Sequence, residues 1–275
     1  MSTYAYLGPK GTFTEAALKK ITSSNDRLMP YANVTAALDA VRLGKAHFAL
    51  VPIENSVEGV VARTLDELAS GEPLVITQEV TLPVSFALLT LPGTDPKNIK
   101  SIATHPHAES QCRSFIAKNY PTAQIIETPS TAAAAKGLTN KDYEAAIAGV
   151  NAAKNYNLKI ITEDIGDNQA AVTRFVVVEK TRRQAGATGK DRTSLAVFIA
   201  IDHAGALLEI LNEFAKHQVN LTFIQSRPTG SQLGHYHFII DAEGHIEDAP
   251  ISAALAGLKQ ICEDIRFLGS YPQAK

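Results

Sequence analysis

The chain has few cysteines, no surplus of positive charge and no long apolar run. Its 275 residues include only two cysteines, Cys112 and Cys262, and their wide separation predicts neither a disulfide framework nor a zinc knuckle. The formal net charge of -2 leaves no excess of Lys or Arg to neutralise a phosphate backbone or an anionic membrane. No apolar run of about 18 residues and no signal-peptide pattern is present. We expect a soluble, cytoplasmic, globular protein with neither nucleic acid nor membrane as a partner.

The chain also lacks the motifs of common cofactor sites. It contains no GK[ST] phosphate loop, no GxGxxG dinucleotide fingerprint and no GxSxG nucleophile elbow. Histidines occur in two close pairs, His105 with His107 and His235 with His237, but neither pair has an evident third ligand or supporting carboxylate. We therefore expect no metal, no redox cofactor and no covalent intermediate.

Short apolar runs alternate with amphipathic, alanine-rich segments through the first two thirds of the chain. They predict strands at residues 4–7, 48–52, 84–90, 101–104, 123–126, 145–148, 159–162 and 172–178, with helices at 14–21, 60–69, 108–119 and 132–139. This order is typical of parallel-sheet α/β architecture. It divides into one lobe of about residues 1–80 plus 159–180 and a second of about residues 81–158. Two lobes joined by crossovers usually bind a ligand in the cleft between them.

The composition changes abruptly at residues 181–192, TRRQAGATGKDR, which contain almost no apolar side chain. We expect this stretch to be a linker. Beyond it, the pattern predicts strands at residues 195–201, 221–226, 235–240 and 265–268 and helices at 206–216 and 251–262. The order βαββαβ is the ferredoxin-like arrangement, so residues 193–275 are expected to form a separate α+β domain.

Polar residues follow predicted strands at three places where a helix is expected to begin. Thr12, with Glu15 three residues later, forms a capping-box pattern. Each place can be an ordinary helix cap, or it can offer free backbone N–H groups to an anion such as a carboxylate. Both interpretations stay open, although three such places over two lobes would suit a small dianion. The candidates are Thr12, the triplet Glu54, Asn55 and Ser56, and the pair Ser130 and Thr131.

Thr173, Arg174 and Phe175 open an apolar strand. Alternation along a strand places Thr173 and Phe175 on one face and Arg174 on the other. A guanidinium can hold a carboxylate by two parallel hydrogen bonds. Arg174 is therefore a candidate substrate clamp, and a surface ion pair is the equally open alternative.

Five motifs taken together resemble the prephenate dehydratase family, in the same order and with similar spacing. They are YLGPKGTFTEAAL, VPIENSVEGVV, THPHAESQC, STAAAA and VTRFVVV. The C-terminal part resembles an ACT domain through GALLEIL, NLTFIQSRP and YHFIIDAEGH. The resemblance implies a catalytic domain over residues 1–180, similar to the type II periplasmic binding protein fold, followed by a domain that senses phenylalanine.

The resemblance also implies a reaction and its residues. Prephenate would lose one carboxylate as CO2 and its ring hydroxyl as water, leaving phenylpyruvate. Thr173 maps to a threonine regarded as essential in the family, and we interpret it as a hydrogen-bond donor to the departing oxygen, because a threonine is too weak an acid to ionise at neutral pH. Glu54 ranks second, as a proton donor acting through water if burial favoured its protonated form. The expected substrate-binding residues are Arg174, Phe175, Thr12, Asn55, Ser56, Ser130 and Thr131.

In the C-terminal domain the resemblance implies that phenylalanine binds between paired copies and lowers activity, with a homodimer or homotetramer as the assembly. The expected effector-binding residues are Gly205, Ala206, Leu207, Leu208, Gln225, Ser226, Arg227 and Pro228. Three positions depart from the family pattern. Ala171 stands where Asn is frequent, Ala204 where Pro is common, and Gln225 in place of the usual Glu. The departure at Ala171 leaves any role of that asparagine unassigned, and those at Ala204 and Gln225 would alter the strength or selectivity of effector binding.

Two other functions compete with this interpretation. Arogenate dehydratase acts on a substrate that differs only by an amino group, and the sequence does not separate the two activities. A non-catalytic protein could instead use the two-lobed cleft to bind a small anion, but the expected intracellular location and the Thr173–Arg174 pair argue against it. Because the first motif begins at Tyr4, we expect a monofunctional enzyme.

Overall fold

The computed structural model describes residues 1–180, 186–199, 201, 203–229 and 236–274. These residues form two compact units. One comprises Met1–Ala37, Leu50–Val60 and Thr81–Phe175, and the other comprises Leu38–Ala49, Val61–Val80 and Val176–Lys275. Among the residues with a described position, no helix is long and apolar enough to cross a membrane.

The first lobe is built on a sheet of strand order β2-β1-β3-β11-β5, with β4 paired to β3. Strands β1 and β2 run parallel, as the α/β pattern predicts. The strands are β1 (Thr3–Leu7), β2 (Arg27–Tyr31), β3 (Phe48–Asn55), β4 (Gly59–Val60), β5 (Val75–Pro83) and β11 (Val172–Glu179), and the helices are α1 (Phe13–Lys19), α2 (Val34–Arg42) and α3 (Ala62–Ser70). The sequence pattern did not predict β2, α2 or β5.

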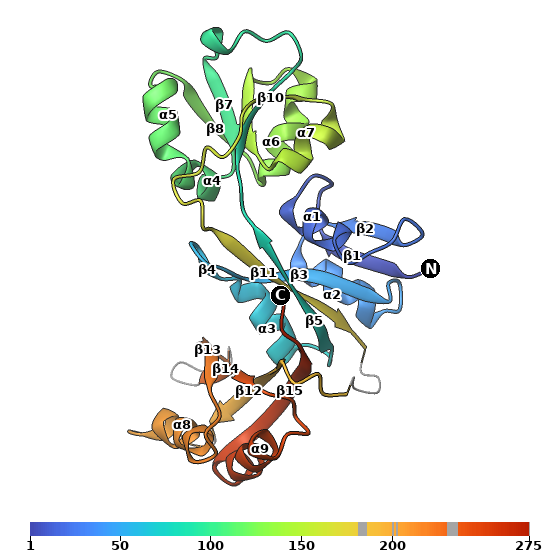
Figure 1. Cartoon of the computed structure of the whole chain (residues 1–275), viewed down its shortest axis with the longest axis vertical. Coiled ribbons are helices and arrows are strands. Elements are labelled where there is room, and N and C mark those ends of the chain that lie inside the picture. Colours follow the sequence, from blue (N-terminus) through green and yellow to red (C-terminus); the bar gives the residue numbers. More distant parts are fainter. Residues whose placement is uncertain (181–185, 200, 202, 230–235, 275) are drawn as a thin grey trace. The chain divides into compact units, whose positions relative to one another are not determined.

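The second lobe has a five-stranded sheet of order β10-β6-β9-β7-β8. Its elements are β6 (Ala87–Thr90), β7 (Ser101–Thr104), β8 (Gln124–Glu127), β9 (Ala145–Ala148), β10 (Lys159–Thr162), α4 (Pro106–Gln111), α5 (Arg113–Asn119), α6 (Thr131–Gly137), α7 (Val150–Tyr156) and the 3₁₀ turns η1 (Pro96–Asn98) and η2 (Leu138–Asn140). Alternation along β9 sends Ala145 and Ile147 to one face, against α4 and α5, and Ala146 and Ala148 to the other, against α6 and α7 (Figure 1).

Three expectations for this lobe are corrected. The segment 159–162 was assigned to the first lobe, but β10 pairs antiparallel with β6, because Asn157 ends α7 in a left-handed conformation and the chain turns back onto the nearest sheet edge. The sheet is also mixed, since β6 and β9 are antiparallel. The helix expected at 108–119 is divided at Cys112, which lies between α4 and α5.

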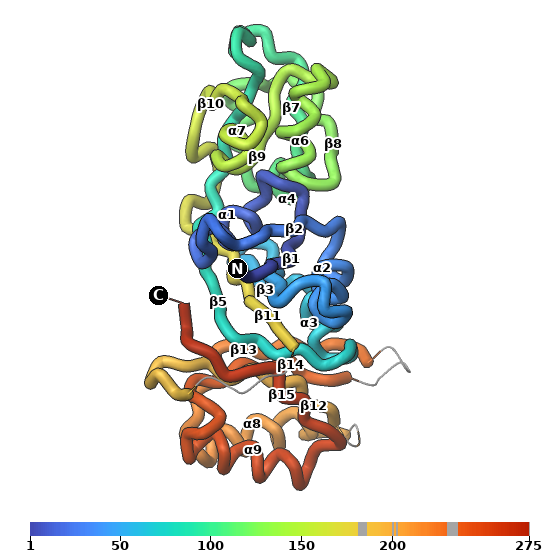
Figure 2. Tube along the Cα trace, turned by 90° about the vertical axis from the view of Figure 1, so that its right-hand side faces the viewer, coloured from blue at the N-terminus to red at the C-terminus, as the bar shows by residue number. Residues whose placement is uncertain are grey.

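The C-terminal domain has the predicted βαββαβ order. Its elements are β12 (Asp191–Ile199), α8 (Ala206–Lys216), β13 (Leu221–Pro228), β14 (Tyr236–Glu243), α9 (Ala249–Ile261) and β15 (Cys262–Pro272), and the sheet order is β13-β14-β12-β15. Helices α8 and α9 lie on one face of this sheet (Figure 2). Phe214 and Leu258 from these helices pack against Val197 and Ile240 from the strands. The expected linker at 181–192 overlaps β12 at Asp191, and residues 181–185 lie outside the described residues.

The opposite face of the C-terminal sheet carries arginines that pair with α3 and β5, all within the second compact unit. Arg227 of β13 makes two hydrogen bonds of 2.8 Å to the carboxylate of Asp66. Arg192 of β12 lies 2.8 Å from Glu79, and Arg266 of β15 donates to the carbonyl of Gly71 at 2.6 Å. The backbones also approach closely, because a Cβ at Gly269 of β15 would collide with the carbonyl oxygen of Ile76 in β5.

Candidate active site

A short hairpin at the end of β3 organises the first part of the site. Glu54 and Asn55 pair with Val60 and Gly59 of β4, and Gly59 has the positive φ of 81° that this tight turn requires. The side-chain oxygen of Asn55 accepts hydrogen bonds from the backbone N–H groups of Val57, at 2.8 Å, and Glu58, at 2.9 Å. Asn55 therefore holds residues 55–58 in one conformation.

The hairpin is joined to the strand that carries Thr173. Ser56 exchanges two hydrogen bonds of 2.9 Å with the backbone of Val172, one through its N–H and one through its hydroxyl oxygen. Asn55 Nδ2 donates to Thr173 Oγ1 at 2.8 Å. Since the Thr173 oxygen accepts this hydrogen bond, its own proton is directed to another acceptor. The structure thus brings together Asn55, Ser56 and Thr173.

Arg174 and Glu54 form a second pair on the same two strands. Arg174 Nε lies 3.2 Å from Glu54 Oε2. Neighbouring strand residues project to opposite faces, so this pair leaves the sheet on the other side from Asn55 and Thr173. The ion-pair interpretation of Arg174 is confirmed, but the guanidinium is buried instead of on the surface. The burial on which a proton-donating Glu54 depends is absent, because its side chain is 40% exposed.

Phe175 does not take the place expected of a substrate contact. Its side chain is 1% exposed and is among the largest fully buried side chains of the chain. The apolar run that follows it, Val176 to Val178, is buried as well. We therefore assign Phe175 to the core of the first lobe, as its place in a central strand favours.

At the start of α1 the cap interpretation of Thr12 is confirmed. Its hydroxyl oxygen accepts from the N–H of Glu15 at 3.3 Å. Glu15, which is buried, accepts from the N–H of Gly11 at 2.5 Å, from Asn155 at 2.9 Å and from Lys19 at 2.9 Å. The carboxylate of Glu15 therefore accepts the hydrogen bond from the Gly11 N–H group. This N–H group is one that could otherwise have been offered to a bound anion.

The environment of Glu15 gives it a shifted pKa and a testable effect on stability. Burial opposes its ionisation, but hydrogen bonds from Gly11, Lys19 and Asn155 outweigh burial and hold the pKa below its usual value. A lowered pKa stabilises the folded state above the ordinary value of about 4.3, and this stabilisation is lost as the pH falls through the folded-state pKa. We expect Glu15→Gln to lower the free energy of unfolding by about 1–3 kcal/mol at pH 7.

Urea denaturation of both proteins at pH 7 and near pH 3 measures this effect. The difference between Glu15→Gln and the parent protein should shrink at the lower pH, because the parent carboxylate gains protons as the pH falls towards its lowered pKa. Glu163→Gln, at an exposed glutamate, is the control and should leave stability unchanged at both values. A difference that stayed the same at both pH values would contradict an ionised Glu15 as its source.

Ser130 also acts as a helix cap. Its hydroxyl oxygen accepts from the N–H of Ala133 at 3.0 Å, and its backbone is extended at the start of α6. Thr131 is the first residue of that helix and is half-buried. The α6 helix packs by its alanines, Ala134 and Ala135, against the second-lobe sheet. The cap interpretation is thus the one that the contacts of Ser130 support.

The sequence interpretation missed a contact between the two lobes. Gln111, the last residue of α4, donates from Nε2 to Glu58 Oε1 at 2.8 Å. His107 Nδ1 lies 3.6 Å from the other Glu58 oxygen. Both partners stand in motifs already quoted for the family resemblance, THPHAESQC and VPIENSVEG, so the signal was present in the sequence. Neither motif alone, however, indicates that Gln111 of one contacts Glu58 of the other.

The described histidines of the two close pairs make contacts within the protein. His105 caps α4 by accepting from the N–H of His107 at 3.2 Å, and burial lowers its pKa. His237 is buried and stacks on Phe198, whereas His235 lies outside the described residues. Within the described part of the chain, no group of three or more His, Cys, Asp or Glu side chains could hold a metal ion.

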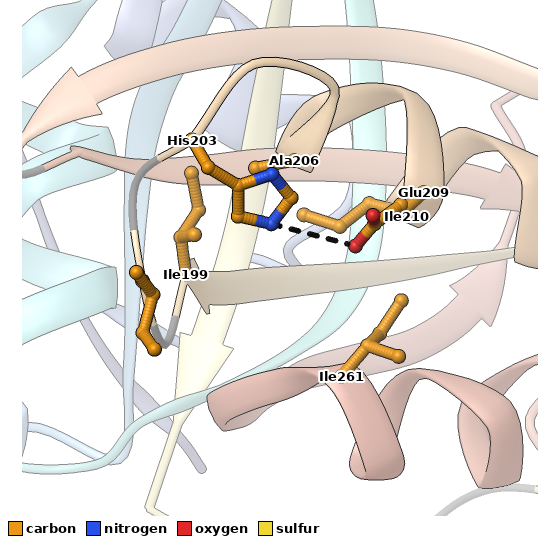
Figure 3. Close-up of a pocket in the computed structure, with 7 residues that line it drawn as sticks. Ile199, His203, Ala206, Glu209, Ile210 and Ile261 are labelled. Carbon is orange, nitrogen blue, oxygen red and sulfur yellow. Dashed lines mark ion pairs between the residues drawn. The ribbon is translucent and has the colours of Figure 1, made fainter.

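Of the residues expected to bind the effector, Ala206 lines one hollow, and Arg227 and Pro228 line another. A hollow of about 180 Å³ opens at the start of α8, where His203 and Glu209 form an ion pair of 3.7 Å (Figure 3). Ala206 lines this hollow, and Gly205, with a φ of 100°, is the cap residue just before the helix. Leu207 and Leu208 are exposed on α8.

The second motif, QSRP, lies at the end of β13. Arg227 and Pro228 line a hollow of about 480 Å³ together with Arg63 and Asp66 of α3. Gln225 Nε2 donates to the carbonyl of its neighbour Ser226 at 3.0 Å. Those expected effector residues that line a hollow are therefore separated within a single chain, with Ala206 at one hollow and Arg227 and Pro228 at the other.

The fold and the site define a class of protein, a two-lobed α/β domain with a hairpin-supported threonine, followed by a ferredoxin-like domain. A family model for prephenate dehydratase matches residues 4–183 and one for the ACT domain matches residues 193–260. The chain belongs to the prephenate dehydratase family.

Three relatives illustrate the similarity. The prephenate dehydratase of Amycolatopsis methanolica is 42% identical over 275 residues, covering 100% of this chain and 90% of its own. The crystal structure of a prephenate dehydratase from Arthrobacter aurescens in complex with L-Phe is 48% identical, with a TM-score of 0.94 over 98% of this chain and 90% of its own. GqqA, described as a quorum quenching acylase, is 27% identical, with a TM-score of 0.87 over 98% of this chain and 97% of its own.

Proposed function

We propose that the protein converts prephenate to phenylpyruvate, CO2 and water. The observation that carries this proposal is the 2.8 Å hydrogen bond from Asn55 Nδ2 to Thr173 Oγ1. It occupies the threonine oxygen as an acceptor, so that the hydroxyl proton can be donated to substrate. Membership of the family and the 42% identity with the Amycolatopsis enzyme support the same reaction.

The proposed reaction depends more on a hydrogen-bond donor to the leaving oxygen than on a general base. The bond between the ring and one carboxylate breaks, its electron pair moves through the ring, and the carbon–oxygen bond to the ring hydroxyl breaks at the other end. Aromatisation drives these changes, and hydroxide is the difficult leaving group. A hydrogen bond from Thr173 to the departing oxygen stabilises the charge that develops there, and the hydroxide that leaves takes a proton from solvent to become water. Arg174 would hold a substrate carboxylate.

The test is to incubate the purified protein separately with prephenate, with arogenate and with an N-acyl amide. Phenylpyruvate, phenylalanine and the free amine are the respective products to be followed. We expect phenylpyruvate from prephenate. Faster conversion of arogenate would instead assign the protein as an arogenate dehydratase, and hydrolysis of the amide alone would assign the activity named for GqqA. Product from none of the three would favour a binding protein.

We further propose that phenylalanine binds the C-terminal domain and lowers activity. The Arthrobacter relative, at 48% identity, was crystallised with L-Phe. The separation of the two effector motifs within one chain supports a site completed by a second copy, in which Ala206 of one chain would approach Gln225 of the other. Exposed apolar side chains on this domain, Leu208, Ile224 and Tyr236, support pairing into a homodimer or homotetramer. Two free cysteines suit a cytosolic location.

The ion pair of Arg227 with Asp66 would connect the expected effector site to helix α3, and this connection can be tested by mutation. Arg227 belongs to the expected effector motif, and Asp66 belongs to α3, the helix that follows the Asn55 hairpin in the chain. We expect Asp66→Asn to weaken inhibition by phenylalanine at least tenfold, because a coupling of about 1–3 kcal/mol is typical and one broken ion pair can remove it. Activity without phenylalanine should change less than twofold.

Inhibition curves with phenylalanine, together with calorimetry of phenylalanine binding, measure this effect. The control is Glu72→Gln, at an exposed carboxylate beyond the same helix, which should keep the parent curve. Retained binding with lost inhibition is the expected combination for Asp66→Asn. Unchanged inhibition would show that the ion pair does not carry the coupling.

A further inference from the structure

Glu58 stands at the tip of the hairpin and makes contacts in two directions. Its carboxylate accepts from Gln111 Nε2 at 2.8 Å and lies 3.6 Å from His107 Nδ1. Gln111 is itself held in place, because it is buried and its carbonyl accepts from the N–H of Asp167 at 2.6 Å. The side chain of Glu58 is thus fixed to the end of α4 in the second lobe.

The backbone of the same residue is fixed to the site in the first lobe. The N–H of Glu58 donates to Asn55 Oδ1 at 2.9 Å, and the amide nitrogen of Asn55 donates to Thr173 Oγ1 at 2.8 Å. An amide group is planar, so the direction of its oxygen fixes the direction of its nitrogen. The position of Glu58, together with that of Val57, therefore sets how Asn55 presents its donor to Thr173.

We propose that Glu58 is a positioning residue, which transmits the contact with Gln111 to the orientation of the Thr173 hydroxyl. The proposal rests on the proposed dehydratase function of Thr173. Four groups form one continuous path of hydrogen bonds, from Gln111 through Glu58 and Asn55 to Thr173. When the second lobe holds Glu58, Asn55 occupies one lone pair of the threonine oxygen and aims its proton elsewhere. Without its contacts to Gln111 and His107, the turn at residues 55–58 loses these two side-chain ties to α4.

The expected effect is on the rate of the chemical step and not on substrate affinity. Misplacement of a reacting group by a distant change can cost up to about 100-fold in rate. Since Asn55 keeps its bond to the N–H of Val57, we expect Glu58→Ala to lower kcat about tenfold, with KM within twofold of the parent value. Glu58→Gln retains a carbonyl oxygen that can accept from Gln111, so it should recover most of kcat.

Steady-state kinetics with prephenate and thermal unfolding of the same preparations test the proposal. Glu58→Ala introduced into a Gln111→Ala protein should add no further loss of kcat, because the path is already broken. Glu163→Ala, at an exposed glutamate of the second lobe, is the matched control and should keep the parent kcat.

Each other outcome has a defined meaning. An unchanged kcat in Glu58→Ala overturns the proposal, and so does a further full loss in the Gln111→Ala background. If Glu58→Ala and Glu58→Gln lower the melting temperature and kcat together, the role is structural and the proposal is also overturned. The parent protein is assayed first, and a parent without prephenate turnover would refute the proposed function rather than the role of Glu58.

Discussion

Replacing Thr173 by alanine is expected to lower kcat for prephenate about 100- to 1000-fold, the usual cost of losing one transition-state hydrogen-bond donor. The side chain is buried, and its oxygen already accepts from Asn55. Because the oxygen serves as the acceptor in that bond, the hydroxyl hydrogen of Thr173 can be directed at the leaving hydroxyl group. The donor matters most when negative charge develops on the leaving oxygen, so KM should change little.

Two measurements separate this role from a structural one. Thr173→Ser keeps the hydroxyl and loses only a methyl group, so its kcat should stay within about tenfold of the parent. Thermal unfolding of Thr173→Ala should show a folded protein, since only a hydroxyl and a methyl group are removed. A Thr173→Ala protein with parent turnover would exclude Thr173 as the donor.

Replacing Arg174 by glutamine should raise KM for prephenate about 10- to 100-fold. A hydrogen bond to a charged group contributes about 1.5–3 kcal/mol, and the guanidinium is the charged group at this strand able to hold a carboxylate by two parallel bonds. Arg174→Lys keeps the charge but loses the planar fork, so it should recover only part of the affinity. Steady-state kinetics and calorimetry with phenylpyruvate measure the change.

The control for burial is Arg42→Gln. Arg42 is also buried and is paired with acidic residues, Glu67 at 2.7 Å and Asp39 at 2.9 Å, but it has no proposed contact with substrate. Removing one partner of a buried ion pair commonly destabilises a protein, so both variants should unfold at lower temperature. Only Arg174→Gln should raise KM, and an equal rise in both would assign the effect to lost stability.

Features of the fold that depend on short sequence patterns were predictable. The βαββαβ order of the C-terminal domain follows from alternating strands and amphipathic helices, and α8 spans the predicted residues Ala206–Lys216. The caps at Thr12 and Ser130 also follow from local rules, because the acceptor and the backbone donor lie three residues apart. At both positions the cap explained the polar residue without a bound anion.

Features that depend on contacts far apart in the chain were not predictable. An isolated strand pattern does not state which sheet it joins, so β10 was placed in the wrong lobe. The pairing of Asn55 with Thr173 joins positions 118 residues apart, and family motifs indicated the two residues without indicating their hydrogen bond. Phe175 was expected to contact substrate because it follows Thr173 and Arg174 in the family motif. Its large apolar side chain is instead buried in the core, as is common for such a residue in a central strand.

The arginines on the face of the C-terminal sheet that contacts α3 and β5 mean that the regulatory domain cannot be removed without exposing buried groups. Glu79 and Asp66 precede the expected linker at residues 181–192, yet their cationic partners lie at its last residue, Arg192, and beyond it, at Arg227. A truncated protein ending near residue 180 would expose a nearly buried carboxylate at Glu79 and uncover the β5 backbone beneath Gly269. Feedback-insensitive forms are therefore better sought by single substitutions than by deletion.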